Sequence, residues 1–155
     1  MDVSGYLSGS GPEMAATGGL ALMLSWIVVS DLRDLRIPDA ASLPLILCGL
    51  AVNAWGPGLA LSEAVIGAGA GYAVFALLGE GYFRLRGQEG LGLGDAKLLA
   101  AAGAWLGWRA LPMLVLVAAV LALAVALVLR RRRLAFGPWL ALAFWTLWVM
   151  RVAGG

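Results

Sequence analysis

Two aspartates border apolar segments of the sequence and are the residues best suited to acid–base chemistry. Asp31 directly follows the apolar segment 14–30, and Asp95 opens the apolar segment 94–108. An ionisable side chain beside such segments is costly to bury, which makes each of them a functional candidate. Two carboxyl groups brought together cannot both ionise, so one accepts a proton from water while the other polarises a peptide carbonyl. Such a pair suits peptide-bond hydrolysis without a nucleophilic side chain.

Each of these features also has a structural interpretation when it is taken alone. Asp31 fits a helix-end acid that pairs with Arg33 or Arg36, and Asp95 fits an N-terminal helix cap. The glycines before Asp95, which include Gly92 and Gly94, fit an ordinary loop or a backbone that another chain approaches closely. The functional interpretation therefore depends on the elements that bring the two acids together.

The composition indicates that these elements are membrane helices. Of the 155 residues, 62% are hydrophobic and 13% are charged, against about a quarter charged in soluble domains. The mean hydropathy is +0.91. Lipid supplies no hydrogen bonds, so spanning segments must be helices or a closed barrel, and apolar blocks without strict alternation favour helices. We expect an all-α, polytopic membrane protein surrounded by the lipid bilayer.

Charged residues and Gly/Pro breaks divide the chain into six apolar segments within a single transmembrane domain, 1–155. Each segment is close to the length that a helix needs to cross about 30 Å of hydrocarbon. The expected helices cover about 14–30, 40–56, 64–83, 94–108, 110–129 and 134–150.

The basic residues predict the topology. Nine of the eleven fall in alternate loops, after the first, third and fifth segments. By the positive-inside rule these loops are cytoplasmic and both termini lie outside. Asp31 and Asp95 are then at the same, cytoplasmic, end of the bundle. The nine residues are Arg33, Arg36, Arg84, Arg86, Lys97, Arg130, Arg131, Arg132 and Arg133.

The composition gives little support for a metal site or for a nucleic-acid partner. The chain has no histidine and one cysteine, Cys48, whereas a structural zinc needs about four His, Cys or carboxylate ligands. We therefore expect neither a metal nor another cofactor. The net charge of +2 is too small to indicate a nucleic-acid partner.

Both aspartates lie in motifs that resemble the signatures of type IV prepilin peptidases. In the first, five residues separate Asp31 from Ile37-Pro38-Asp39. The second is Gly92-Leu93-Gly94-Asp95 with Lys97 two residues later, and the similarity continues through 98–108. Three further pairs or triplets also resemble the family: Gly71-Tyr72, Glu89-Gly90 and Phe136-Gly137-Pro138.

The resemblance implies a Gly-x-Gly-Asp aspartic endopeptidase of the bacterial inner membrane. Its substrates are prepilins or pseudopilins of type IV pili or type II secretion, and it cleaves their short basic leader after a glycine at the cytoplasmic face. Asp31 and Asp95 inherit the catalytic role. Gly92, Gly94, Lys97, Pro38 and Asp39 are expected to support the motifs. Larger members add a cytoplasmic methyltransferase domain with paired Cys-x-x-Cys motifs, which this sequence does not contain, so we expect a peptidase without methyltransferase activity.

Other functions remain open at this point. In a membrane scaffold or a proton- or cation-coupled transporter subunit, the two acids would bind a cation or relay protons, but a relay predicts acids at several depths. A pseudoprotease that only docks pilins and an archaeal-type preflagellin peptidase are further alternatives. Glu80, in the third segment, is unusual for the family; it either reaches the interface near Arg84 or perturbs the site.

Overall fold

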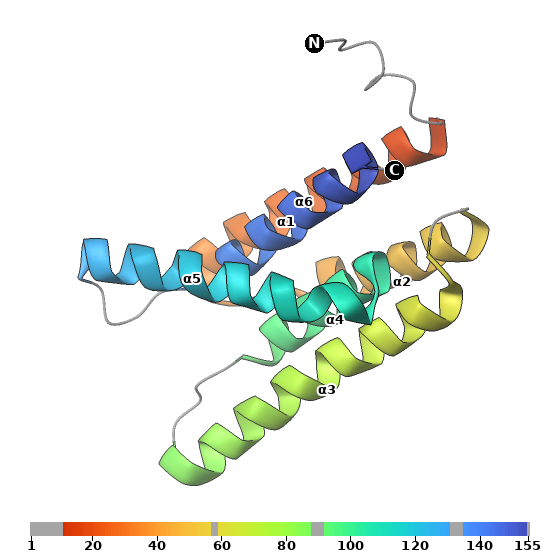
Figure 1. Ribbon diagram of the computed structural model, residues 1–155. Helices are drawn as coiled ribbons and strands as arrows, with labels where there is room; N and C mark the ends of the chain where they lie inside the picture. Colours follow the sequence, from red (N-terminus) through yellow and green to blue (C-terminus); the bar gives the residue numbers. More distant parts are fainter. Residues whose placement is uncertain (1–10, 57–58, 88–91, 131–134, 155) are drawn as a thin grey trace.

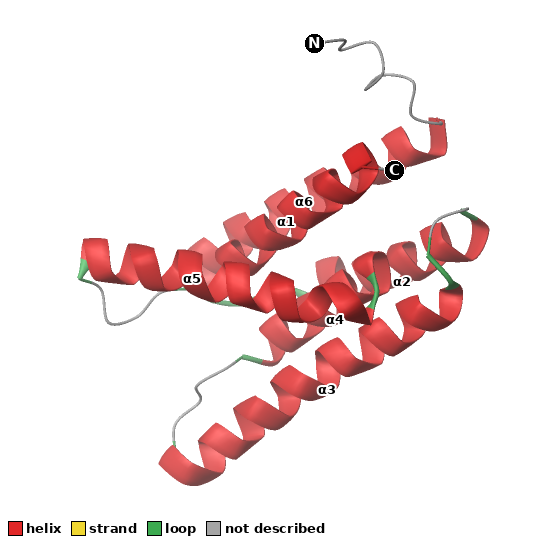
Figure 2. Ribbon diagram, viewed as in Figure 1, coloured by secondary structure: helices red, strands yellow, loops and turns green. Residues whose placement is uncertain are grey.

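The computed structural model describes residues 11–56, 59–87, 92–130 and 135–154, and this part of the chain is helical throughout its length apart from short connections (Figures 1 and 2). No strand occurs among these residues, which confirms the all-α prediction. The elements are α1 (Gly11–Asp34), α2 (Asp39–Trp55), α3 (Leu61–Arg86), α4 (Leu93–Leu106), the 3₁₀ helix η2 (Trp108–Ala110), α5 (Leu111–Leu129) and α6 (Gly137–Gly154).

Each expected segment overlaps one helix, but the ends differ. The first helix continues to Asp34, so Asp31 lies inside the last turns of α1 rather than after it. The third continues to Arg86. Hydropathy marks the apolar part of a helix, whereas backbone hydrogen bonding continues through the charged residues that follow. The expected start of the sixth helix, Leu134, lies outside the described residues, and so do Arg131–Arg133.

Three helices are long and apolar enough to cross a membrane. These spans are Glu13–Asp34, Leu61–Arg86 and Trp108–Leu129. α2 is apolar but has 17 residues. α4 has 14, which gives a length of roughly 21 Å, short of the ~30 Å hydrocarbon layer. The prediction of six spans is therefore not confirmed, although the apolar helices agree with a membrane protein.

α4 is the central helix of the molecule. All its residues from Leu98 to Leu106 are buried, and α2, α3, α5 and α6 contact it. A helix that is apolar on every side lies either in lipid or among other helices, and α4 is of the second kind. α4 lies against α3 at glycine contacts, because a Cβ atom at Gly103 would collide with the carbonyl of Gly67. The two backbones therefore touch directly.

The C-terminal end of α4 is fixed by side chains from α2 and α6. Asn53 donates from Nδ2 to the carbonyl oxygen of Ala104 at 2.8 Å. The guanidinium of Arg151 donates to the carbonyl of Trp105 and, at 3.3 Å, to Oδ1 of Asn53. Carbonyl groups in the last turn of a helix have no partner within the helix, so these donors satisfy them.

The remaining helices form a frame with two distinct ends. α1 and α6 run side by side, with the start of α1 near the end of α6 (Figure 1). α3 and α5 end on the opposite side of the molecule, and α3 continues well past the start of α4. The N-terminus of α4 therefore opens into the interior of this frame.

Candidate active site

A cavity of about 610 Å³ lies at the N-terminal end of α4. Its walls are the end of α1, the connection from α1 to α2, the segment of α3 between Phe75 and Phe83, and the first turns of α4. Asp31 and Asp95 both line it. Asp31 comes from the last turns of α1 and Asp95 is the third residue of α4, and their carboxyl groups are near enough to interact electrostatically. The structure thus brings the two aspartates of the sequence analysis together.

One carboxylate oxygen of Asp31 is buried without a partner. The residue is 6% exposed, and its Oδ2 atom accepts no hydrogen bond from the described residues. Asp31 also forms no ion pair within 4.0 Å in this part of the chain, so pairing with Arg33 or Arg36 does not explain it. A buried polar atom without a partner is costly and is found where a ligand or reaction needs it. Oδ2 lies against Gly137 at the start of α6.

Asp95 does not cap its helix. The N-cap position of α4 is Gly92, with no side-chain cap, and the backbone N–H of Asp95 donates to the carbonyl oxygen of Gly92 at 3.1 Å. The Asp95 carboxyl group is in the first turn of α4, where the helix dipole favours negative charge. Because the Asp95 side chain does not cap the helix, its carboxyl group is free to line the cavity.

The two motif glycines before Asp95 differ in their surroundings. A Cβ atom at Gly94 would lie 2.9 Å from Cβ of Ile37, so glycine allows the α1–α2 connection to approach α4. Gly92 has open space around it and a φ of −72°. Neither its contacts nor its conformation requires glycine there.

Gly137, at the start of α6, contacts Asp31. A Cβ atom at this position would collide with Oδ2 of Asp31. The sequence marked Phe136-Gly137-Pro138 as a family feature but gave no role to Gly137. The signal is a glycine beside the proline at a helix start, and its contact with Asp31 depends on the packing of α6 against α1.

The motif residues on α2 and α4 meet across the cavity. Pro38 is the N-cap of α2, and its carbonyl oxygen accepts from the backbone N–H groups of Ala41 and Ser42 at 3.0 and 3.1 Å. The next residue, Asp39, accepts a hydrogen bond at Oδ1 from Nζ of Lys97 at 2.5 Å. This ion pair joins the first turn of α2 to the second turn of α4.

α3 supplies the apolar wall of the cavity and one acid. Phe75 is buried, and its ring centroid lies 6.2 Å from that of Phe136. Glu80 lines the cavity and accepts from Nε of Arg84 at 2.8 Å. Glu80 thus pairs with Arg84 and borders the site, and its effect on the site stays a prediction.

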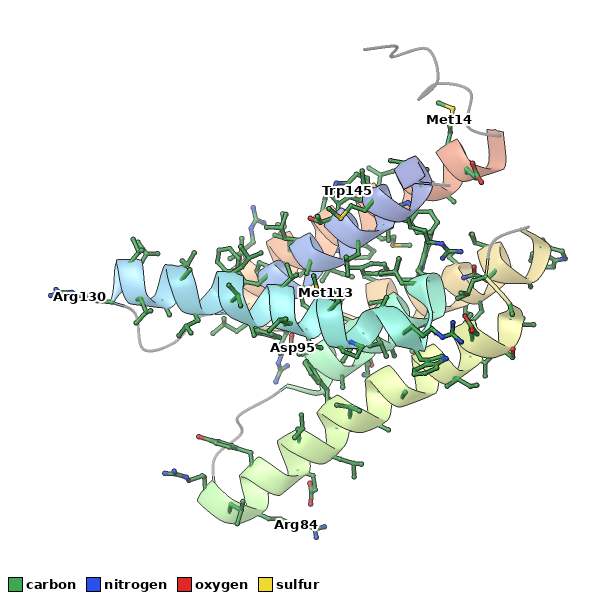
Figure 3. All side chains as sticks on the ribbon, in the orientation of Figure 1. Met14, Arg84, Asp95, Met113, Arg130 and Trp145 are labelled. Atoms are coloured by element: carbon green, nitrogen blue, oxygen red, sulfur yellow. The ribbon has the colours of Figure 1, made fainter. Side chains whose placement is uncertain are left out.

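The site is set back from the ends of the neighbouring helices. Figure 3 shows Asp95 near the middle of the molecule, with Arg84 near the end of α3 and Arg130 at the end of α5 far beyond it. The two aspartates line one cavity, and α3 extends past the start of α4; their place at the cytoplasmic end of the bundle stays a prediction.

One known protein family matches the part of the chain that forms most of this site. The type IV leader peptidase family matches residues 19–127, which include both aspartates. The chain belongs to this family. The match extends over α2, α3 and α4, the elements that form the cavity with the end of α1, and it stops before Gly137.

Curated relatives carry the name prepilin leader peptidase/N-methyltransferase. The protein of Pectobacterium carotovorum subsp. carotovorum is 48% identical over 140 residues, 84% of this chain and 50% of the relative. That of Burkholderia pseudomallei (strain 1026b) is 48% identical over 139 residues, 85% and 45% of the two chains. The Escherichia coli (strain K12) protein is 45% identical over 135 residues, 81% and 60%. The chain thus spans about half the length of the relatives it matches. No solved structure matches it significantly.

Proposed function

We propose that this protein is a membrane aspartic endopeptidase that removes the short basic leader from type IV prepilins or pseudopilins. The observation that carries the proposal is the shared cavity of Asp31 and Asp95, with one unpaired buried oxygen on Asp31. Membership of the type IV leader peptidase family and the names of the relatives support the choice of substrate.

The proposed mechanism uses the two aspartates alone. One carboxyl group is ionised and accepts a proton from water, whose oxygen attacks the scissile carbonyl carbon. The other is protonated and donates a hydrogen bond to the carbonyl oxygen, where negative charge develops. Collapse of the tetrahedral intermediate breaks the C–N bond and passes a proton to the leaving amine. The remaining cavity residues bind and orient the peptide.

The proposed setting is the bacterial inner membrane, with the cavity facing the cytoplasm and both termini outside. The alternation of basic loops supports this orientation. The arrangement of the helices is consistent with it, because Met14 lies on the side of the molecule away from Arg84 and Arg130 (Figure 3).

Purified protein and a candidate prepilin in detergent provide the test. We expect mass spectrometry to detect a shortened pilin whose new N-terminus follows a glycine, and a leader peptide of the complementary mass. Replacing that glycine of the substrate by leucine should stop the reaction. If several prepilins stay intact with protein that remains folded, the scaffold or transport alternatives would become the better account.

A further inference from the structure

The two motifs together form two pairs of charged residues in the cavity, and each motif supplies one member of each pair. The first motif supplies Asp31 and Asp39, and the second supplies Asp95 and Lys97. Asp31 and Asp95 line the same cavity, where two ionised carboxyl groups would repel each other, while Asp39 and Lys97 form an ion pair at 2.5 Å. One unfavourable pairing and one favourable pairing therefore link the same segments, the start of α4 and the α1–α2 region.

Placing Asp31 and Asp95 together has a free-energy cost that the fold must offset. Two carboxyl groups held at one site either both ionise and repel, or one retains a proton that it would lose in water. Either penalty is relieved if the start of α4 moves away from α1. The N-cap of α4, Gly92, makes no side-chain hydrogen bond, and the contacts with the α3 glycines begin only at Leu99. Before that point the start of α4 is held by packing, mainly that of Gly94 against Ile37.

The favourable contact lies where it can resist that movement. The side chain of Lys97 is 24% exposed and that of Asp39 is 60% exposed. The helix dipole disfavours a cation near the start of α4 and favours an acid in the first turn of α2. Lys97 therefore depends on Asp39 for compensation. No other acid lies within 4.0 Å of Lys97 among the described residues.

The spacing of Asp95 and Lys97 determines which way α4 faces. Residues two positions apart in an α-helix point about 200° apart around its axis. Both side chains nevertheless reach the same cavity from the start of α4, so holding Lys97 against Asp39 on α2 restricts how this part of the helix can rotate and thereby where Asp95 lies. The ion pair thus fixes both the rotation and the position of the helix start.

We propose that the ion pair of Lys97 and Asp39 is a positioning element that holds Asp95 beside Asp31 against the cost of placing two carboxyl groups together. Its catalytic consequence rests on the proposed peptidase function. The pair acts on the geometry of the aspartates and makes no contact with the scissile bond.

Charge exchange tests the catalytic part. We expect Lys97→Gln and Asp39→Asn each to lower kcat by roughly 10- to 100-fold, with KM changed little. The double variant Asp39→Lys/Lys97→Asp should recover most of the lost kcat. The matched control is Arg109→Gln, which breaks an ion pair with Glu63 outside the cavity, 3.4 Å long, and should cleave at the parent rate. An exchanged pair no better than the single variants, or a loss confined to KM, would overturn the proposal.

Amide hydrogen exchange tests the structural part without substrate. We expect Lys97→Gln to increase exchange several-fold at the amides of residues 95 and 96, which donate to the carbonyl oxygen of Gly92, and the same substitution in an Asp95→Asn background to leave these amides protected. Equal opening in both backgrounds would show that the ion pair does not oppose the cost of the two acids, and no opening in either would remove its positioning role. Because this measurement needs no cleavage, it separates failure of this inference from failure of the peptidase function.

Discussion

At the scale of single residues, Asp31 and Asp95 reach one cavity because a residue without a side chain lies beside each. Gly137 leaves room for the Asp31 carboxyl group, and Gly94 leaves room for Ile37 beside the start of α4. The acids were predictable from sequence because each lies in a motif, Asp31 before Ile37-Pro38-Asp39 and Asp95 in Gly92-Leu93-Gly94-Asp95. The glycine contacts were not, since they depend on distances between helices.

Substitution of Gly137 tests this arrangement. An added methyl group would collide with Oδ2 of Asp31, so we expect Gly137→Ala to lower the cleavage rate by roughly tenfold or more through displacement of that carboxyl group. Initial rates with a prepilin substrate measure the effect. The matched control is Gly69→Ala, outside the cavity, where a Cβ atom would meet nothing within 4 Å. Parent-like cleavage by Gly137→Ala would show that Asp31 does not need this space.

At the scale of elements, α4 is the part that sequence reasoning described least well. Its segment has the right composition for a span, but hydropathy does not distinguish an apolar residue that faces lipid from one that faces another helix. The structure makes α4 short, buried on all sides and fixed at its C-terminal end. The pairing of Lys97 with Asp39 was likewise hidden, because it depends on how α2 and α4 align.

Two glycines on α3 provide a matched test of its contact with α4. A Cβ atom at Gly67 would collide with the backbone carbonyl of Gly103, whereas one at Gly69 meets nothing within 4 Å. We expect Gly67→Ala to destabilise the protein by about 1–3 kcal/mol, and Gly69→Ala to be neutral or stabilising by up to ~1 kcal/mol. Thermal unfolding in detergent measures both. Equal midpoints for the two variants would argue against direct contact of the helices.

The C-terminal end of α4 gives a second prediction at this scale. Asn53→Ala removes the donor to Ala104 and leaves a buried carbonyl unpaired, which we expect to cost about 1–3 kcal/mol of stability. Thr146→Ala serves as the control, because its hydroxyl donates to Leu142 on an exposed surface. Unfolding midpoints compare the two. A loss no larger for Asn53→Ala than for Thr146→Ala would remove Asn53 from the stabilisation of α4.

At the scale of the whole molecule, sequence predicted that the two aspartates share one end, because the basic residues alternate between loops. It did not predict that the site is set back from that end, since the lengths of α3 and α4 relative to each other follow from packing. The orientation in the membrane remains a prediction of the charge pattern.

Labelling of single cysteines tests that orientation. In a Cys48→Ala background, Met14→Cys reports on the start of α1 and Leu85→Cys on the end of α3; both positions are exposed. A membrane-impermeant maleimide added to intact spheroplasts should label Met14→Cys and should reach Leu85→Cys only after the membrane is permeabilised. The reverse pattern would place the cavity on the outer side and contradict cleavage at the cytoplasmic face.

The most direct test of the central claim is leader cleavage by the Asp31→Asn and Asp95→Asn variants, each compared with the parent at matched membrane levels. Asparagine keeps the size of the side chain but neither accepts nor donates a proton as the mechanism requires. The account predicts that the parent releases the leader and that each single substitution abolishes the reaction. Cleavage that survives either substitution would remove that aspartate from the mechanism and contradict a two-aspartate site.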